Sequence, residues 1–145
     1  MLELKQITKE DIRFLYDSYL EYIKYLNDLG INLSEPSFEE HEKFVKKFLY
    51  DKKNHSYKNW YIVYFDSEKI GNFNLKKNNE FGYQIINKYQ GKGFGTLAFE
   101  KFFEIHPKKL VWARSKIKNT RSHSILKKFG FCVTDYEFHI NENQS

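Results

Sequence analysis

Three glycines alternate with larger residues in the stretch that decides the fold, Gln90-Gly91-Lys92-Gly93-Phe94-Gly95-Thr96. A strand pattern precedes the stretch and an amphipathic helical pattern follows it, so we expect it to join a strand to a helix. Glycines permit unusual backbone angles and let main-chain N–H groups approach a ligand closely. N–H groups in the first turn of a helix lack intrahelical acceptors, and the helix dipole adds positive character there. The stretch therefore predicts a site for phosphate or pyrophosphate, with Lys92 at its edge.

Two other phosphate-binding patterns do not fit this loop. A Walker A loop requires G-x-x-x-x-G-K-[ST], but the residue directly before Thr96 is Gly95 and not a lysine. The dinucleotide-binding pattern G-x-G-x-x-G has another spacing and belongs to an early βαβ unit. A glycine-rich turn that only reverses the chain remains the purely structural alternative.

Outward from the loop, hydrophobic spacing and capping residues predict the other elements. Thr8 with Asp11 has the capping-box pattern of a helix N-terminus, and Ser37 with Glu40 repeats it. Gly30 is typical of a helix C-terminus. The expected helices cover 8–29, 37–49, 93–105 and 120–129. The expected strands cover 2–7, 60–65, 70–76, 80–86, 109–114 and 131–140, the last as one strand or a pair.

The resulting order of elements is β-α-α-β-β-β-α-β-α-β. A meander followed by βαβ crossovers predicts an α/β (α+β) fold, with a mixed sheet between two layers of helices. Residues 60–65 form a run that is too apolar for a surface strand. With 145 residues, the chain is expected to form a single domain, residues 1–145, around one core.

Composition narrows the functional classes. The only cysteine is Cys132, so no internal disulfide can form, and no His/Cys cluster suggests a metal site. No apolar run approaches the roughly 20 residues of a membrane span, and the first residues lack a signal-peptide pattern, so a cytoplasmic location is expected. The net charge of +5 indicates an anionic partner. Nucleic acid is not favoured, because no RNP-like, zinc-finger or helix-turn-helix pattern accompanies the charge.

Three motifs in sequence order resemble a known family. The loop 90–95 matches [QR]-x-x-G-x-[GA] at every fixed position, and Glu80-Phe81-Gly82-Tyr83-Gln84-Ile85 looks like the strand that precedes it. Downstream, Asn119-Thr120-Arg121-Ser122 and Lys128-Phe129-Gly130-Phe131 are similar to an N-x-x-S…K-x-G-F ending. Together these motifs resemble the GNAT superfamily of acyl-CoA-dependent N-acetyltransferases over about residues 60–131.

The resemblance implies how acetyl-coenzyme A, the co-substrate, would bind. The main-chain amides of Gln90, Gly91, Lys92, Gly93, Phe94, Gly95 and Thr96 would hold its pyrophosphate. The fourth and fifth strands would splay apart, and the pantetheine arm would pair with the backbone of Tyr83, Gln84 and Ile85. Asn119 would bond the pantetheine or the adjoining main chain. The 3′-phosphate would meet basic residues drawn from Arg114, Lys116, Lys118, Arg121, Lys127 and Lys128, each of which could equally belong to a solvated surface.

Acetyl transfer to an amine needs a neutral amine, a stabilised oxyanion and a proton for the departing thiolate. An alkylammonium has a pKa of about 10.4, so a general base must deprotonate it at neutral pH. Glu80 is the first candidate for this base, and an exposed carboxylate at a strand start is an equal alternative. By resemblance to the family, the main-chain N–H of Ile85 is the expected oxyanion donor.

The proton donor departs from the family pattern. Many relatives have a tyrosine seven residues after the asparagine, and that position here is Leu126. Ser122 is the candidate substitute, with helix capping as its structural alternative. His123, Tyr83 and solvent are further options.

The acceptor is expected to be a primary amine of a small molecule, for instance a nucleotide-linked amino sugar, or a peptide N-terminus. Acidic and aromatic residues of the first two helices suit a cationic amine, but an ordinary core stripe with a charged outer face would have the same composition. The alternative function is a catalytically weak acyl-CoA-binding module or regulator, which Leu126 favours. A homodimer remains open.

Overall fold

The computed structural model describes residues 1–134 and 137–141. Its strands are β1 (Leu2–Gln6), β2 (Tyr57–Phe65), β3 (Glu68–Lys76), β4 (Glu80–Ile85), β5 (Trp112–Arg114), β6 (Phe131–Thr134) and β7 (Glu137–Ile140). Its α-helices are α1 (Ile12–Asp28), α2 (Phe38–Tyr50), α3 (Phe94–Ile105) and α4 (Thr120–Lys128). Short 3-10 turns are η1 (Lys9–Asp11), η2 (Lys52–Asn54), η3 (Asn87–Tyr89) and η4 (Lys108–Leu110).

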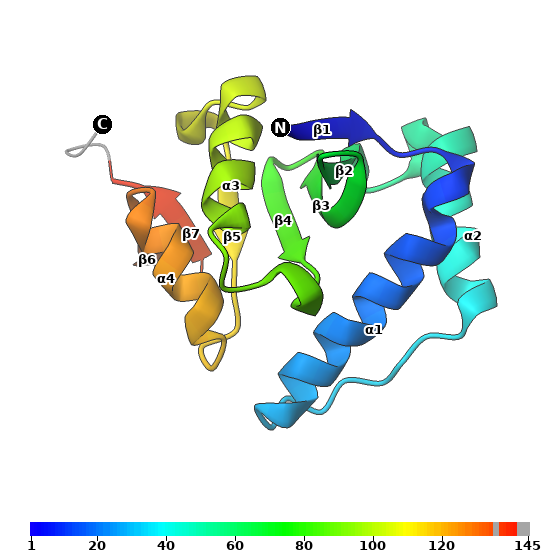
Figure 1. Cartoon of the computed structure of the whole chain (residues 1–145), viewed down its shortest axis with the longest axis horizontal. Helices are drawn as coiled ribbons and strands as arrows, with labels where there is room; N and C mark the ends of the chain where they lie inside the picture. The colour runs from blue at the N-terminus through cyan, green and yellow to red at the C-terminus, as the bar shows by residue number, and fades with distance from the viewer. Residues whose placement is uncertain (135–136, 142–145) are drawn as a thin grey trace.

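The strands form one seven-stranded mixed sheet in the order β1-β2-β3-β4-β5-β7-β6. Neighbouring strands are antiparallel except β4 and β5, which are parallel. Figure 1 shows α1 and α2 on the right of the view, and α3 and α4 left of its centre, where they overlap strands β5 and β7. The α/β mixed-sheet fold expected from the sequence is confirmed. No helix in residues 1–134 or 137–141 is long and apolar enough to span a membrane.

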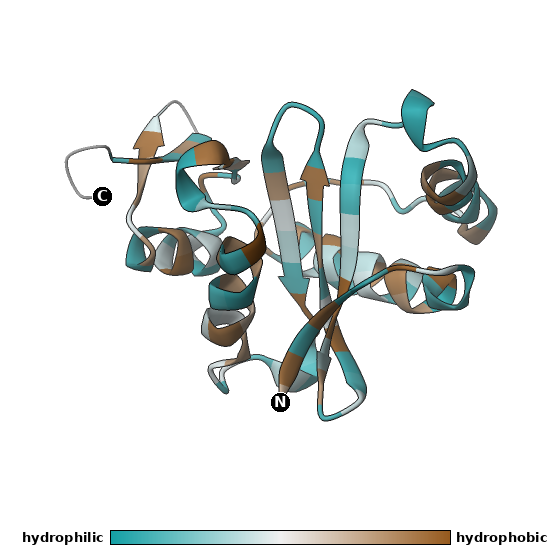
Figure 2. Cartoon of the chain, turned by 90° about the horizontal axis from the view of Figure 1, so that it is seen from above, coloured by the Kyte–Doolittle hydropathy of each residue, from teal (hydrophilic) through white to brown (hydrophobic). Residues whose placement is uncertain are grey.

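Strand β2 shows why the sheet needs helices on both faces. Tyr61 and Val63 pack into the core cluster that contains α3 residues, whereas Trp60 and Ile62 pack into a second cluster with α1 and α2. Successive side chains of a strand point to opposite faces, so an uninterrupted apolar run fits a strand covered on both sides. The helices carry both hydrophobic and hydrophilic residues along their lengths, as expected for elements with one buried face (Figure 2).

Local capping chemistry sets the helix starts as the sequence indicates. The Asp11 carboxylate accepts a bond from the Thr8 N–H at 2.8 Å, which completes the capping box before α1. The Ser37 hydroxyl accepts from the Glu40 N–H at 3.1 Å at the start of α2. Gly30 follows α1 with a φ of +89°, a conformation that glycine adopts without steric cost.

Several strand boundaries differ from expectation. Strand β3 begins at Glu68, two residues before the expected start at Ile70, because the turn that precedes it takes only Asp66 and Ser67. Strand β2 begins at Tyr57, three residues before the expected start at Trp60. The strand expected over 109–114 is reduced to Trp112–Arg114, because Lys108–Leu110 closes a 3-10 turn. The final segment forms two antiparallel strands, β6 and β7, while residues 135–136 between them lie outside the described residues.

The shortness of β5 opens one edge of β4. The two parallel strands pair only at Glu80 with Trp112 and at Phe81 with Ala113. Beyond Phe81, β4 continues to Ile85 paired with β3 alone. The expected splaying of the fourth and fifth strands is therefore present, and the candidate functional site lies at this opening.

Candidate active site

The main chain of β4 turns its free hydrogen-bonding groups toward the opening. The Ile86 N–H donates to the Ile70 carbonyl of β3 at 2.9 Å. Because successive residues of a strand direct their main-chain groups to opposite sides, the N–H groups of Ile85 and Tyr83 face the opening instead. The Ile85 carbonyl on that side accepts from Nε2 of Gln90 at 2.7 Å, which fixes the start of the glycine loop against the strand.

The glycine loop presents bare amides at the start of α3. Gly91 and Gly93 have φ angles of +74° and +84°, and a side chain at either position would meet no atom within 4 Å. Gly93 is the N-cap of α3, and the first intrahelical bond runs from the Leu97 N–H to the Gly93 carbonyl at 3.3 Å. The amides of residues 94–96 thus precede the first helical bond and can bind an anion.

Gly95 has a different role from the other two glycines. Gly95 lies inside α3 and is absent from the positive-φ residues, so it does not use the unusual backbone angles that glycine permits. A Cβ at this position would lie 3.1 Å from Cδ1 of Ile125 in α4. The missing side chain therefore permits close packing of α3 on α4.

Two cations of the predicted basic set bond directly to the loop. Nζ of Lys128 donates to Oγ1 of Thr96 at 3.1 Å. The Arg121 guanidinium donates to Oε1 of Gln90 and lies over the Tyr25 ring, 4.1 Å from its centroid. Their positive charges add to that of the helix N-terminus, so this end of the site suits an anion.

Asn119 holds the first turn of α4 in place. Its side chain is almost fully buried, and Oδ1 accepts from the Ser122 N–H at 3.3 Å and from the Tyr25 hydroxyl at 3.1 Å. The Asn119 oxygen thus caps α4 and joins it to α1.

Ser122 and Tyr83, considered separately in the sequence, meet in the structure. Both side chains line the same cavity; burial raises the pKa of Tyr83 to about 12, and the nearby Ser122 partly offsets this rise. The phenol is therefore protonated at neutral pH. Leu126, which occupies the position of the family tyrosine, is 1% exposed and offers only methyl groups.

A cavity of about 320 Å³ connects these features. Its wall near the loop includes Gln90, Asn119 and Ser122, and its middle is formed by residues 81–85 of β4. Since β2 and β3 lie on the other side of β4 from β5, the cavity ends there in a second group of residues. That group, the acceptor chamber, consists of Tyr19, His41, Tyr57, Trp60, Asn72 and Asn74.

The acceptor chamber depends on residues of β4 that leave room or connect to α1. A Cβ on Gly82 would lie 2.9 Å from Nδ2 of Asn74, so glycine lets the Asn74 side chain lie against β4. Nε2 of Gln84 donates to the Ser18 carbonyl of α1 at 2.5 Å. Sequence reasoning missed Asn72 and Asn74, because nothing in the pattern of β3 distinguishes them from other strand residues.

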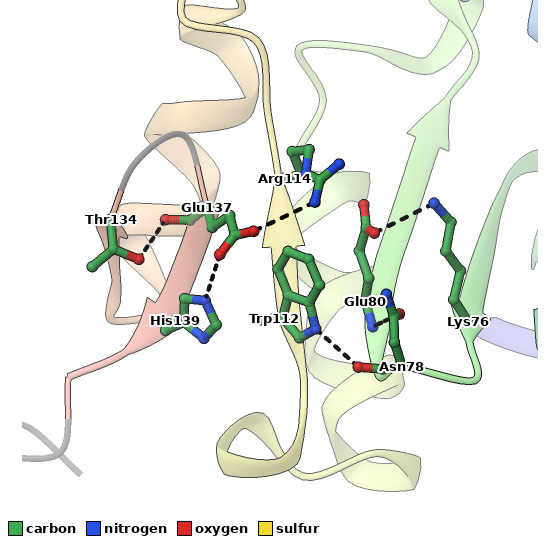
Figure 3. Close-up of polar contacts among 8 residues, drawn as sticks. All are labelled: Lys76, Asn78, Glu80, Trp112, Arg114, Thr134, Glu137 and His139. Carbon is green, nitrogen blue, oxygen red and sulfur yellow. Dashed lines mark hydrogen bonds and ion pairs between the residues drawn. The ribbon is translucent and has the colours of Figure 1, made fainter.

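Glu80 lies beside the chamber rather than in its wall. Its carboxylate is 13% exposed and pairs with Nζ of Lys76 at 3.3 Å (Figure 3). It is not among the residues that line the cavity, but its charge contributes, after burial, to raising the pKa of the Tyr57 phenol to about 12. The Glu80 carboxylate therefore does not line the chamber, and its charge acts on the chamber only by way of the Tyr57 phenol.

Further charges on the same side of the structure are also paired. Figure 3 shows the Arg114 guanidinium directed at Glu137, with a nitrogen–oxygen distance of 3.4 Å. The other Glu137 oxygen lies 3.5 Å from Nε2 of His139. Within residues 1–134 and 137–141, no group of three His, Cys, Asp or Glu side chains could hold a metal ion.

The chain was compared with known families and structures. It matches the model of the acetyltransferase (GNAT) domain over residues 1–132. A spermidine N-acetyltransferase from Vibrio cholerae, in complex with CoA and spermine, is 21% identical with a TM-score of 0.73, over 97% of this chain and 88% of that one. RimL, a ribosomal L7/L12 alpha-N-protein acetyltransferase in complex with coenzyme A, is 16% identical with a TM-score of 0.72, over 95% and 89%.

An acetyltransferase from Thermus thermophilus is 18% identical with a TM-score of 0.73, over 95% of each chain. No curated protein matches the sequence. The structural likenesses support the fold, while the family model spans nearly the whole sequence. The chain therefore belongs to the GNAT family of acetyl-CoA-dependent N-acetyltransferases.

Proposed function

We propose that the protein transfers an acetyl group from acetyl-CoA to a primary amine of a small molecule, such as a nucleotide-linked amino sugar, or of a peptide N-terminus. The observation that carries this proposal is the cavity that runs from the open edge of β4 to the acceptor chamber. Such a cavity lets a donor and an acceptor approach one strand from its two sides.

The residues at the loop end fit acetyl-CoA. Gly91 and Gly93 leave open space where side chains would block the approach to the amides of residues 90–96. In the proposal these amides bind the pyrophosphate, and Lys128 and Arg121 add charge beside it. The pantetheine arm pairs with the backbone of residues 83–85, and Asn119 holds the adjoining turn.

The catalytic roles follow from the same geometry. Bound acetyl-CoA supplies an acetyl group activated as a thioester. The Ile85 N–H stabilises negative charge on the carbonyl oxygen, Glu80 accepts a proton from the amine through water, and Ser122 with Tyr83 donates one to the thiolate. The presence of Ser122 and a protonated Tyr83 phenol in one cavity wall supports the last role, because both carry a hydroxyl proton there.

The runner-up is an acyl-CoA-binding module without appreciable turnover. Its support is Leu126, which places an apolar side chain where many relatives have a proton donor. Such a module would bind acetyl-CoA yet release no thiol with any amine.

The proposal includes a cytoplasmic setting, supported by the unpaired Cys132 thiol, and extends to a homodimer as an open option. Sedimentation of the purified chain measures its oligomeric state.

Isothermal titration and thiol release together test the proposal. We expect saturable acetyl-CoA binding, and thiol release with at least one amine in a panel of amino sugars, aminoglycosides, polyamines and peptide N-termini. Binding without release over the whole panel would favour the binding module. No binding at all would contradict both functions.

A further inference from the structure

His41 lies in the wall of the acceptor chamber without a structural task for its nitrogens. It is 7% exposed, on the face of α2 that packs against α1, with its ring 5.5 Å from that of Tyr16 and 5.6 Å from that of Tyr19. Its buried Nδ1 has no hydrogen-bond partner, and no bond to Nε2 is present in the described part of the chain.

His55, another buried histidine, shows the contrast. Its Nδ1 accepts from the Tyr57 N–H at 2.9 Å, and its Nε2 lies 3.2 Å from the Phe44 carbonyl. Both nitrogens of His55 thus hold the fold together. A buried polar group normally finds such partners, so the unused imidazole of His41 in a cavity wall points to a ligand.

The other chamber residues are neutral. Asn72 and Asn74 contribute amides, and the Asn72 oxygen accepts from Nε1 of Trp60 at 3.3 Å. Tyr19 and Tyr57 contribute phenols. These groups form hydrogen bonds and aromatic contacts, and none carries a charge at neutral pH.

The six residues of the acceptor chamber include no carboxylate. The carboxylate that lines the described cavity, Glu21, belongs to its loop end and accepts from the Asn87 N–H at 2.8 Å. Glu80 pairs with Lys76, and Glu137 pairs with Arg114 (Figure 3). A polyamine would bring several positive charges into a chamber that has no unpaired carboxylate among the described residues to meet them.

Burial also keeps the side chains of the chamber uncharged. It lowers the pKa of His41 and raises that of Tyr57 to about 12, so both are neutral near pH 7. The groups that face the His41 ring from α1 are the phenols of Tyr16 and Tyr19. A desolvated, neutral surrounding favours the uncharged form of a bound amine.

Amines differ greatly in how much of the uncharged form they offer. An α-amine with a pKa of about 7.8 is roughly one-third uncharged at pH 7.5, whereas a lysine-type amine with a pKa of about 10.4 is roughly 0.1% uncharged. For a chamber that accepts only the uncharged amine, a weakly basic acceptor therefore offers more than a hundred times as much usable substrate as a lysine-type amine at the same total concentration.

We propose that the acceptor is a weakly basic primary amine, bound uncharged and hydrogen-bonded by the His41 imidazole. The amine carries a neighbouring carbonyl or hydroxyl group, as in a peptide α-amine or an amino sugar, for which Asn72 and Asn74 supply partners. This inference rests on the proposed acetyl transfer and makes His41 a substrate-binding residue.

The experiment compares kcat/KM at pH 7.5 for a seryl-alanine dipeptide, glucosamine, Nα-acetyl-lysine amide and spermidine. The full chain is assayed as wild type, His41→Phe, His41→Gln and His139→Phe. We expect at least a tenfold preference for the dipeptide or glucosamine over both strongly basic amines. The better of those two substrates identifies the source of the weakly basic amine.

His41→Phe should lower kcat/KM for that substrate at least tenfold, chiefly through KM, because the ring remains but its nitrogens are lost. His41→Gln should restore much of the loss, since its amide can replace the imidazole bond. His139→Phe is the matched control and should resemble wild type, since His139 lies outside the cavity wall. Acetyl-CoA affinity should be equal in all four proteins, which also verifies folding.

A preference for spermidine or for the lysine derivative would overturn the inference, as would an unchanged KM in a folded His41→Phe protein. In either case the proposed acetyl transfer would stand. Wild-type protein that fails to bind acetyl-CoA would overturn the proposed function itself, and the inference with it.

Discussion

Some side chains around the cavity form hydrogen bonds within the protein, whereas others have none and are available to a ligand. The Asn119 oxygen is used twice, by the Ser122 N–H and the Tyr25 hydroxyl. The Gln90 side chain is used by the Ile85 carbonyl and by Arg121. The His41 imidazole has no such partner. Substitution of the first two should therefore disturb the shape of the site, whereas substitution of His41 should leave that shape unchanged and weaken ligand binding.

Glu80→Gln tests the proposed base. With a strongly basic acceptor such as Nα-acetyl-lysine amide, we expect turnover to fall by about 10²–10⁴-fold near pH 7 and to recover toward pH 10, where solvent supplies the free amine. The measurement is a pH profile of kcat at saturating acetyl-CoA for wild type and variant. A deficit of equal size at every pH would remove Glu80 from the mechanism, in agreement with its position outside the cavity wall.

Ser122→Ala and Tyr83→Phe test the proposed proton donor. Each variant should lower kcat by roughly 10–100-fold with little change in KM, because proton transfer to the thiolate would be slowed. If hydroxyl and phenol act as one unit, the double variant should be no slower than the slower single one. Full activity of Ser122→Ala would mean that solvent protonates the thiolate.

At the scale of elements, we propose that the loop and α3 bind the anion of acetyl-CoA as one unit. Gly91 and Gly93 shape the loop, while Gly95 belongs to the packing of α3 on α4. The same motif thus combines ligand approach with helix packing. In the proposed complex, the opening between β4 and β5 directs the pantetheine arm of acetyl-CoA toward the cavity.

Gly93→Val tests this unit. A β-branched residue at a φ of +84° is strained, and its side chain would occupy the space in front of the amides, so acetyl-CoA affinity should fall at least a hundredfold by isothermal titration. Gly130→Val is the matched control, because Gly130 has a φ of +89° at the end of α4, away from the loop. Both variants should lose similar stability, roughly 1–2 kcal/mol or more. Equal acetyl-CoA affinity in the two variants would mean that the loop only reverses the chain direction and does not bind acetyl-CoA.

At the scale of the whole molecule, two buried histidines and the half-buried His106 make stability depend on pH. Burial lowers the pKa values of His41, His55 and His106 below 6.5. The unfolded chain therefore binds protons near pH 6.5 that the folded chain does not, and the free energy of unfolding falls as the pH drops below that value. Each unit of depression is equivalent to about 1.4 kcal/mol.

Thermal unfolding at pH 7.5, 6.5 and 5.5 measures this effect. We expect the Tm to be nearly constant above pH 7 and to fall below pH 6.5. His41→Phe should flatten part of the fall without lowering the Tm at pH 7.5, because it removes a buried nitrogen that has no partner. A Tm that does not change between pH 7.5 and 5.5 would contradict the prediction.

Much of the fold was predictable because its signals are local. The capping pairs of Thr8 with Asp11 and Ser37 with Glu40 form within one turn, so sequence spacing reveals them. The apolar run of β2 likewise reports burial on both faces. The length of β5 was not predictable, because it depends on where β4 stops pairing with it.

The sequence by itself determined the order of the elements, the glycine loop at a helix start and the family resemblance, since each depends on neighbours along the chain. Only the tertiary structure decided which groups share the cavity. The antiparallel register sets Asn74 opposite Gly82, and the packing of α2 on α1 brings His41 to the same chamber. Strand pairing and helix packing join residues that are distant in sequence, so the composition of the chamber becomes visible only in the folded chain.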